Sequence, residues 1–239
     1  MKIQAIKTRL LNPPKDNLLD AIKKAVKKIP EKSILCVTSK VVSIWQGRCI
    51  LNNAFTDKDA LIIKESEKYV DRKYAPNKWV MHTIKNNLFI PSAGIDESNA
   101  RGYYILWPDN IKATAKKLYL WLKKQYKIKN CGVIITDSHS VPLRRGVVGI
   151  SLGHYGFPAL KDYRGEEDLF GKKLKLTQTN IVDSIAAAAV LIMGEGAEQT
   201  PLSLVTDLYF IRFSKKKQKI IKKYSSLEVP ISEDLYKLF

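Results

Sequence analysis

Acidic side chains in three separate loops are the residues of this 239-residue chain that could most readily do chemistry. Asp137 follows an apolar run, Asp96 shares a glycine-containing loop with Asn99, and Glu195 lies between two glycines. Carboxylate oxygens held at the ends of strands and helices are suitable ligands for Mg²⁺ or Mn²⁺. We therefore predict a divalent-cation site that leaves room for a phosphate. Each acid alone has a simpler interpretation, such as an Asx cap of a turn at Asp137.

Two adjacent arginines, Arg144 and Arg145, precede Gly146 and could clamp a carboxylate or a phosphate. We predict that one of them takes part in catalysis by holding an anionic substrate. The alternative is an exposed pair without a role. The loop 162–171 combines several acids with two glycines, and it could order a substrate amine or cap a neighbouring helix.

Several common catalytic patterns are missing from the chain. Ser138 and His139 would point to opposite faces of a strand, and no G-x-S-x-G sequence supports a hydrolase. His82 and His154 have no partner at a metal-ligand spacing. The chain has neither a P-loop sequence nor G-x-G-x-x-G, which disfavours the common nucleotide-binding folds.

The chain is strongly basic, with 41 Lys and Arg against 23 Asp and Glu and a net charge of +18. Most of these bases are lysines, whereas bidentate recognition of phosphate favours arginine. The segment 131–200, which holds most of the candidate residues, has seven bases and eight acids. We interpret the surplus as lysine-coated helix faces that could steer anionic substrates, and nucleic-acid binding is the alternative.

Composition limits the remaining classes. An apolar fraction of 45% excludes an intrinsically disordered chain. The three cysteines are widely spaced and fit neither a disulfide framework nor a zinc knuckle. We see no signal peptide and no apolar run long enough to span a bilayer, so we expect a soluble cytoplasmic protein.

Hydrophobic periodicity predicts the elements that must position these residues. We expect helices over 16–29 (with Asp16 as N-cap), 56–70, 109–127 and 180–193, and helical segments in the lysine-rich tail around 215–223. We expect strands over 33–39, 88–91, 131–136, 146–153 and 202–213, and a short segment 41–44 leading to a turn at Gln46-Gly47. The 146–153 strand alternates small and apolar residues, as if another element packs closely on it. Strands and helices mix without a regular βαβ rhythm, which predicts an α+β fold in one unit over 1–239 that could comprise two intertwined subdomains.

Several motifs occur in a fixed order along the chain. They are Ala93-Gly-Ile-Asp-Glu-Ser-Asn99, Val133-Ile-Ile-Thr-Asp-Ser138, Arg144-Arg-Gly-Val-Val-Gly149, Asp162-Tyr-Arg-Gly165, Asp168-Leu-Phe-Gly171 and Met193-Gly-Glu-Gly196. In this order they resemble the coenzyme F420-0:L-glutamate (γ-glutamyl) ligase family. The resemblance covers nearly the whole chain and is strongest from 92 to 201.

The resemblance implies a homodimeric amide ligase with mixed and antiparallel sheets and flanking helices. Such an enzyme uses GTP (or ATP) and a pair of Mg²⁺ or Mn²⁺ ions to join the amine of L-glutamate to a substrate carboxylate through an acyl phosphate. By motif position, Asp96 and Asp137 would hold one metal, and Ser138 and Glu195 the other. The expected nucleotide contacts are Ser39, Lys40, Asn99, Met193, Gly194, Gly196, Ala197, Glu198, Gln199 and Thr200, and the segment from Arg9 to Asn12 matches a nucleotide-contacting segment by position alone.

The chain departs from the family pattern at some positions. A serine-lysine pair shortly after the first predicted strand reads Ser43-Ile44 here, and Lys40 is the nearby substitute. Leu11-Asn12-Pro13-Pro14 replaces a leucine-proline pattern, and His139 stands where a small or amide residue is usual. We expect coenzyme F420-0 as the acceptor, a folate as the runner-up, and a ligase-like protein without activity as a further alternative.

Overall fold

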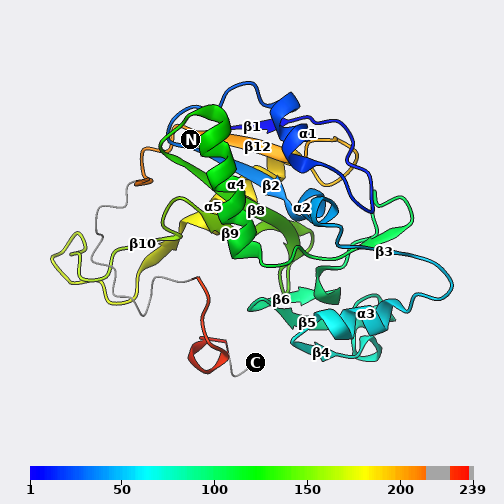
Figure 1. Cartoon of the computed structure of the whole chain (residues 1–239). Coiled ribbons are helices and arrows are strands. Elements are labelled where there is room, and N and C mark those ends of the chain that lie inside the picture. Colours follow the sequence, from blue (N-terminus) through cyan, green and yellow to red (C-terminus); the bar gives the residue numbers. More distant parts are fainter. Residues whose placement is uncertain (214–226, 237–239) are drawn as a thin grey trace.

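A five-stranded mixed sheet in the order β1-β12-β2-β8-β9 forms the centre of the computed structural model, which describes residues 1–213 and 227–236 (Figure 1). Its strands are β1 (Lys2–Ile6), β2 (Ser33–Thr38), β8 (Cys131–Ser140), β9 (Val147–Tyr155) and β12 (Leu202–Thr206). Only β2 and β8 are parallel among these pairs, and their register places Thr38 opposite Thr136. The carboxyl ends of β2 and β8 therefore meet at one edge of the sheet.

Helices cover both faces of this sheet (Figure 1). On one face, α1 (Leu18–Ala25), α2 (Ser39–Gln46) and α4 (Ile111–Tyr126) share a hydrophobic core with Leu35 and Val133. On the other face, α5 (Ile181–Met193) shares a second core with Ile34 and Ile134. Successive strand residues thus alternate between the two cores, as the period of two requires.

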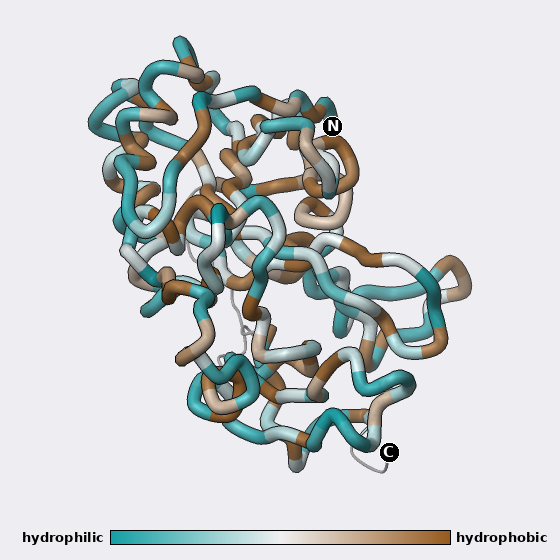
Figure 2. Tube along the Cα trace, turned by 90° about the vertical axis from the view of Figure 1, so that its right-hand side faces the viewer, coloured by the Kyte–Doolittle hydropathy of each residue, from teal (hydrophilic) through white to brown (hydrophobic). Residues whose placement is uncertain are grey.

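A smaller unit is inserted between α2 and α4, and it lies below the central sheet in both views (Figures 1 and 2). It contains α3 (Lys58–Glu65) and a three-stranded sheet of β4 (Lys68–Val70), β5 (His82–Lys85) and β6 (Leu88–Pro91). The pair β3 (Cys49–Leu51) and β7 (Tyr103–Ile105) leads into and out of it. Its own core includes Ile62, Met81 and Tyr104.

The remaining elements are short. A hairpin of β10 (Leu160–Asp162) and β11 (Gln178–Asn180) precedes α5, and four 3₁₀ turns lie at η1 (Arg72–Tyr74), η2 (Pro76–Lys78), η3 (Ser92–Gly94) and η5 (Ile231–Glu233). Within the described ranges, no helix has both the length and the apolar character that crossing a membrane requires.

The predicted α+β class is confirmed, and several predicted elements match observed ones closely. The strand over 88–91 is β6, and the helices over 109–127 and 180–193 correspond to α4 and α5. The lysine-rich segment 215–223 lies outside the described residues. The prediction of a single unit over 1–239 stays a prediction.

Other predicted boundaries are wrong. The first helix ends at Ala25, and its N-cap is Asn17 rather than Asp16, because the Asn17 side chain accepts the Asp20 amide while Asp16 binds Arg9. The segment 41–44 belongs to α2, and the predicted helix over 56–70 divides into α3 and β4. The strand over 202–213 ends at Thr206.

The strand predicted over 131–136 also continues further than expected. β8 runs on to Ser140, so that Asp137 and Ser138 lie within a strand rather than in a loop. After a bulge near Thr136, β9 pairs with each residue of β8 up to Ser140. This pairing keeps the polar residues in the strand. Asp137 and Ser138 consequently point to opposite faces of the sheet.

Gly149 allows α5 to approach β9 closely, as the small residues of the 146–153 segment predicted. A Cβ atom at Gly149 would lie 2.5 Å from the Ala186 carbonyl oxygen and 2.6 Å from Val190 Cβ. Both distances are shorter than a van der Waals contact, so even a methyl group would displace α5.

We predict that Gly149→Ala lowers the free energy of unfolding by about 1–3 kcal/mol, because the new methyl group overpacks the α5 contact. Urea titrations followed by circular dichroism measure the change. Leu191→Ala is the matched control, since Leu191 lies on the same helix and is 80% exposed. Equal midpoints for Gly149→Ala and the wild type would contradict this packing.

Candidate active site

A pocket of about 450 Å³ opens where the carboxyl ends of β2 and β8 meet. Four segments far apart in the sequence complete its wall: 8–11 after β1, the start of α2, the loop 96–101, and the loop 193–201 after α5. Ligands of sheets with parallel strands are commonly bound at this edge. The pocket is thus the principal candidate for a functional site among the described residues.

Asp137 forms the floor of the pocket on β8. Its Oδ2 accepts a short hydrogen bond from the Trp107 indole N–H, and its Oδ1 accepts the Ser138 amide at 3.0 Å. Desolvation of the carboxyl raises its pKa from 3.8 to about 6; repulsion by Asp96 adds to this effect, and the two hydrogen bonds and the Lys40 charge oppose it. A cation bound next to Asp137 would therefore stabilise its ionised form.

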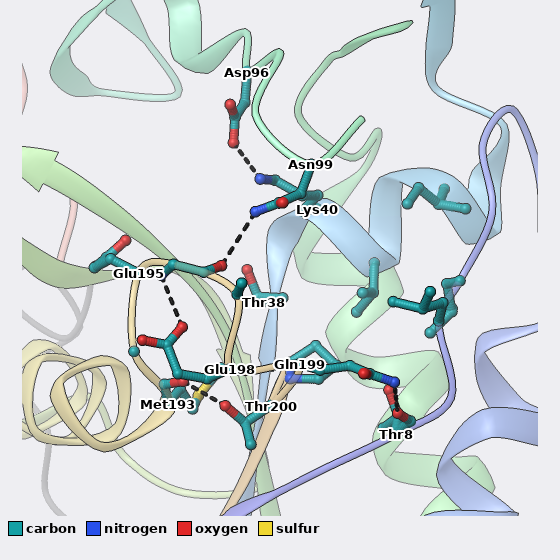
Figure 3. A pocket seen from close by; sticks show the side chains of 18 of the residues that line it. Thr8, Thr38, Lys40, Asp96, Asn99, Met193, Glu195, Glu198, Gln199 and Thr200 are labelled. Atoms are coloured by element: carbon teal, nitrogen blue, oxygen red, sulfur yellow. Dashed lines mark hydrogen bonds and ion pairs between the residues drawn. The ribbon is translucent and has the colours of Figure 1, made fainter. Parts of the chain in front are cut away.

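Lys40 supplies a positive charge to the pocket from the first turn of α2. Its Nζ lies 2.6 Å from Asp96 Oδ2 and donates to the Ser98 carbonyl at 2.9 Å. Burial alone would raise the pKa of Asp96, but the hydrogen bonds from Lys40 and Ser98 lower it overall. Figure 3 shows Lys40 directed at Asp96, with Glu195 on the neighbouring loop.

Glu195 is the third carboxylate of the pocket. Partial desolvation raises its pKa; its hydrogen bond with Ser138 and the Lys40 charge oppose the rise, whereas Glu198 and Asp96 add to it. Asp96 thus adds to the rise in pKa at both Asp137 and Glu195, and Lys40 opposes it at both.

The loop after α5 is closed on itself. Thr200 Oγ donates to the Met193 carbonyl, and the Glu198 carboxylate accepts the Gly196 amide at 2.8 Å. Asn99 Nδ2 donates to the Gly196 carbonyl at 3.1 Å and so connects this loop with the loop 96–101 (Figure 3). The Asn99 contact explains how two motifs almost a hundred residues apart share one pocket.

The structure brings nearly all the residues predicted to bind metal or nucleotide into this pocket. Its wall includes Lys40, Asp96, Asn99, Asp137, Ser138, Met193, Gly194, Glu195, Gly196, Ala197, Glu198, Gln199 and Thr200. Ser39 is buried at the start of α2 and does not line the wall. From the segment 9–12, Arg9, Leu10 and Leu11 line the pocket, and Ile44 contributes an apolar surface.

Other predicted residues lie elsewhere. Arg144 and Arg145 are exposed in the turn between β8 and β9 and do not line the pocket, so their predicted catalytic role stays a prediction. In the acidic loop 162–171, Arg164 pairs with Asp162 at 2.5 Å, and none of these loop residues lines the pocket. His139 lies on β8 outside the pocket wall.

Asp96, Asp137 and Glu195 do not form a closed metal-binding cluster. Across residues 1–213 and 227–236, no group of three or more His, Cys, Asp or Glu side chains is gathered closely enough to hold a metal ion. The Lys40 ammonium lies against Asp96 instead. The predicted metal ligands share one pocket, while metal binding itself stays a prediction.

Trp107 contacts the pocket residue Asp137 without lining the pocket itself, and the sequence did not predict it. Thr8, Thr38 and Arg101 line the wall and were not predicted either. Trp107 is 2% exposed and donates its indole N–H to Asp137 from a segment 30 residues earlier in the chain. A tryptophan just after an apolar run is ordinarily a core residue, so its type and spacing carry no signal of this contact.

Known proteins match this chain over most of its length. Residues 5–207 match the family model described as F420-0:Gamma-glutamyl ligase. A Methanopyrus kandleri protein named coenzyme F420:L-glutamate ligase is 33% identical over 205 residues, which cover 79% of each chain. A Methanococcus maripaludis protein of the same name is 32% identical over 74% of this chain and 76% of its own length. One from Methanocaldococcus jannaschii is 38% identical over 61% of this chain and 57% of its own.

This α+β scaffold gathers acids, a lysine and the loop after α5 in one pocket. The extent of the family match identifies the class of protein. The chain belongs to the F420-0:γ-glutamyl ligase family, whose members are amide-forming ligases.

We predict that Asp137→Asn changes the pH dependence of stability in the presence of a chelator. Because the pKa of Asp137 is about 6 in the folded protein and 3.8 ordinarily, the folded state binds more protons between these values. The wild type therefore loses stability relative to the variant as the pH rises from 4 to 6, by at most about 1.4 kcal/mol per unit of pKa difference. Urea titrations at several pH values measure this difference, and parallel stability curves would contradict it.

Proposed function

We propose that the protein is a γ-glutamyl ligase that adds L-glutamate to the carboxylate of coenzyme F420-0, using a nucleoside triphosphate and divalent metal ions. One observation carries the proposal: Asp96, Asp137 and Glu195 line one pocket at the carboxyl ends of β2 and β8. This pocket belongs to a chain that matches the family over residues 5–207. The relatives named coenzyme F420:L-glutamate ligase supply the acceptor and the amino acid.

The donor set of the pocket fits hard divalent cations. Carboxylate and hydroxyl oxygens are the ligands that Mg²⁺ and Mn²⁺ prefer. The Lys40 ammonium, 2.6 Å from Asp96, would have to move aside for a metal ion at that carboxylate. In the proposal, Asp96 and Asp137 hold one ion, and Ser138 and Glu195 hold the other. Bound metal would neutralise the charge of the nucleotide phosphates and the acceptor carboxylate.

The nucleotide, GTP or ATP, is proposed to occupy the side of the pocket formed by α2 and the loop 193–200. The α2 N-cap, Thr38, makes no side-chain hydrogen bond to the helix, which leaves the first amides of α2 open to a phosphate. Lys40 adds a positive charge in the same turn. Arg9 stands at the rim, where Asp16 fixes its guanidinium through hydrogen bonds of 2.8 Å.

The reaction joins two carboxylate-bearing molecules by activating one of them. An oxygen of the acceptor carboxylate attacks the terminal phosphorus of the nucleotide, which releases the nucleoside diphosphate and leaves an acyl phosphate. The neutral amine of glutamate then attacks the acyl carbon, inorganic phosphate leaves with the bonding electrons, and the nitrogen loses a proton to form the amide. The chain's residues orient these groups and exclude water, which otherwise hydrolyses the acyl phosphate.

Several further features belong to the same proposal. We propose the characteristic fold and homodimer of the family, a cytoplasmic location, and contact of Arg144 or Arg145 with an anionic substrate. The arginines lie in an exposed turn outside the pocket wall, so such contact would require a substrate that extends beyond it.

Incubation with GTP or ATP, Mn²⁺ or Mg²⁺, L-glutamate and coenzyme F420-0 tests the function. We expect a product heavier than the acceptor by one glutamyl residue, identified by mass spectrometry, with release of nucleoside diphosphate. A folate acceptor in a parallel incubation tests the runner-up substrate. A product from the folate alone would contradict the proposed acceptor, and no product from either would contradict the ligase function.

We predict that Asp137→Ala lowers metal-dependent nucleoside triphosphate turnover by at least about 100-fold, because the buried carboxylate that meets the cation is lost. Stopped assays of nucleoside diphosphate release measure the effect. Asp207→Asn is the matched control: it removes an exposed carboxylate outside the pocket, at a positive φ of 56° that asparagine tolerates. Near-normal turnover of Asp137→Ala would refute its assignment.

A further inference from the structure

The Trp107 indole is enclosed so that its N–H can point only at Asp137. Its ring packs against Gly94, where a Cβ atom would come within 2.2 Å of the indole, and Gly94 has a positive φ of 70°. Any side chain at position 94 would therefore displace the ring. The indole N–H can donate a hydrogen bond but cannot accept one. It therefore favours the ionised form of Asp137, in which both oxygens are acceptors.

Three charged side chains from the inserted unit and its border form a network next to this tryptophan. Lys85 Nζ lies 5.6 Å from the centroid of the Trp107 ring and 2.6 Å from Glu65 Oε2. Arg48 pairs with the same Glu65 oxygen at 2.7 Å, and its Nε donates to the Trp107 carbonyl at 3.2 Å. Ring and backbone of the tryptophan are thus fixed separately.

The burial of these charges requires an explanation. Lys85 is only 8% exposed, and desolvation lowers its pKa although Glu65 opposes the change. Buried ion pairs add little stability over apolar packing of the same volume, and in some proteins they serve to specify one defined geometry. The geometry that this network defines is the orientation of the Trp107 ring.

We propose that Arg48, Glu65 and Lys85 are positioning residues that act through Trp107 to hold the Asp137 carboxylate in one orientation toward a divalent cation. With Oδ2 bound to the indole and Oδ1 to the Ser138 amide, the carboxylate cannot rotate freely. Groups that orient a metal ligand in this way commonly contribute about 10–100-fold to metal affinity. The inference rests on the proposed function in taking Asp137 as a metal ligand.

The proposal also gives the inserted unit a role. Glu65 ends α3 and Lys85 ends β5, so both come from the unit between α2 and α4, whereas Asp137 lies on the central sheet. Trp107, in the segment that leaves this unit, connects the two. The unit thereby supports Asp137 indirectly through Trp107, in addition to supplying the pocket residue Asp96.

Mn²⁺ binding to the full chain, measured by electron paramagnetic resonance without nucleotide, glutamate or acceptor, tests the proposal. We expect Trp107→Phe to weaken Mn²⁺ binding about 10–100-fold. Lys85→Met and the milder Glu65→Gln should weaken it to a smaller degree. In the Trp107→Phe background, neither should weaken it further, because both act through the indole.

A second lysine–tryptophan pair provides matched controls. Lys117 Nζ lies 4.7 Å from the centroid of the Trp45 ring, and neither residue lines the pocket. Lys117→Met and Trp45→Phe should keep wild-type Mn²⁺ affinity even if they lower the melting temperature. Addition of Mg²⁺ should change the tryptophan fluorescence of the wild type and of Trp45→Phe, but not that of Trp107→Phe.

Unchanged Mn²⁺ affinity in folded Trp107→Phe, or losses that add in the double variants, would overturn the proposal. Coupled losses of affinity in a protein without ligase activity would refute the proposed function and leave the positioning role standing. An active ligase without such losses would refute only the positioning role. A wild-type chain that binds neither Mn²⁺ nor Mg²⁺ would refute both.

Discussion

The parallel pairing of β2 with β8 is the constraint on which the pocket depends. It sets Thr38 opposite Thr136, so the residues that follow each of them emerge at the same edge of the sheet. Lys40 then reaches the pocket from the first turn of α2, and Asp137 from the next position of β8. A shift of this register by one residue would turn Asp137 toward the α5 face and separate it from Trp107. The pocket therefore forms only when these two strands pair in this register.

Charge distribution separates this edge from the rest of the molecule. The chain as a whole has a net charge of +18, yet among the described residues four carboxylates and three cations line its pocket: Asp96, Asp137, Glu195 and Glu198 with Arg9, Lys40 and Arg101. Desolvation, with repulsion by Asp96, raises the pKa values of Asp137 and Glu195, and Lys40 offsets part of the effect. A cation would relieve the same repulsion more completely. The lysine surplus lies largely outside the segment 131–200 and can steer anionic substrates toward this edge.

Local patterns predicted much of the fold, whereas most of the predicted pocket residues came from the family resemblance. The apolar periodicity of α4 and α5 and the small residues of β9 were sufficient, because helix and strand periods are local properties. The polar end of β8 was not predictable in this way, since Asp137 and Ser138 stay in the strand through pairing with β9. The short apolar segment 41–44 was equally ambiguous, and the structure places it in α2. Contacts between distant residues were out of reach: Lys40 meets Ser98 across 58 positions, and Trp107 meets Asp137 across 30.

We propose that this edge of the sheet binds the divalent cations of a ligase. A crystal structure with Mn²⁺ and a non-hydrolysable nucleotide, with anomalous scattering recorded for manganese, tests it most directly. We expect one manganese peak beside Asp96 and Asp137 and another beside Ser138 and Glu195. We also expect the Lys40 ammonium to have moved away from Asp96. Manganese bound only elsewhere, with the Lys40–Asp96 pair intact and nucleotide in the pocket, would contradict the proposal.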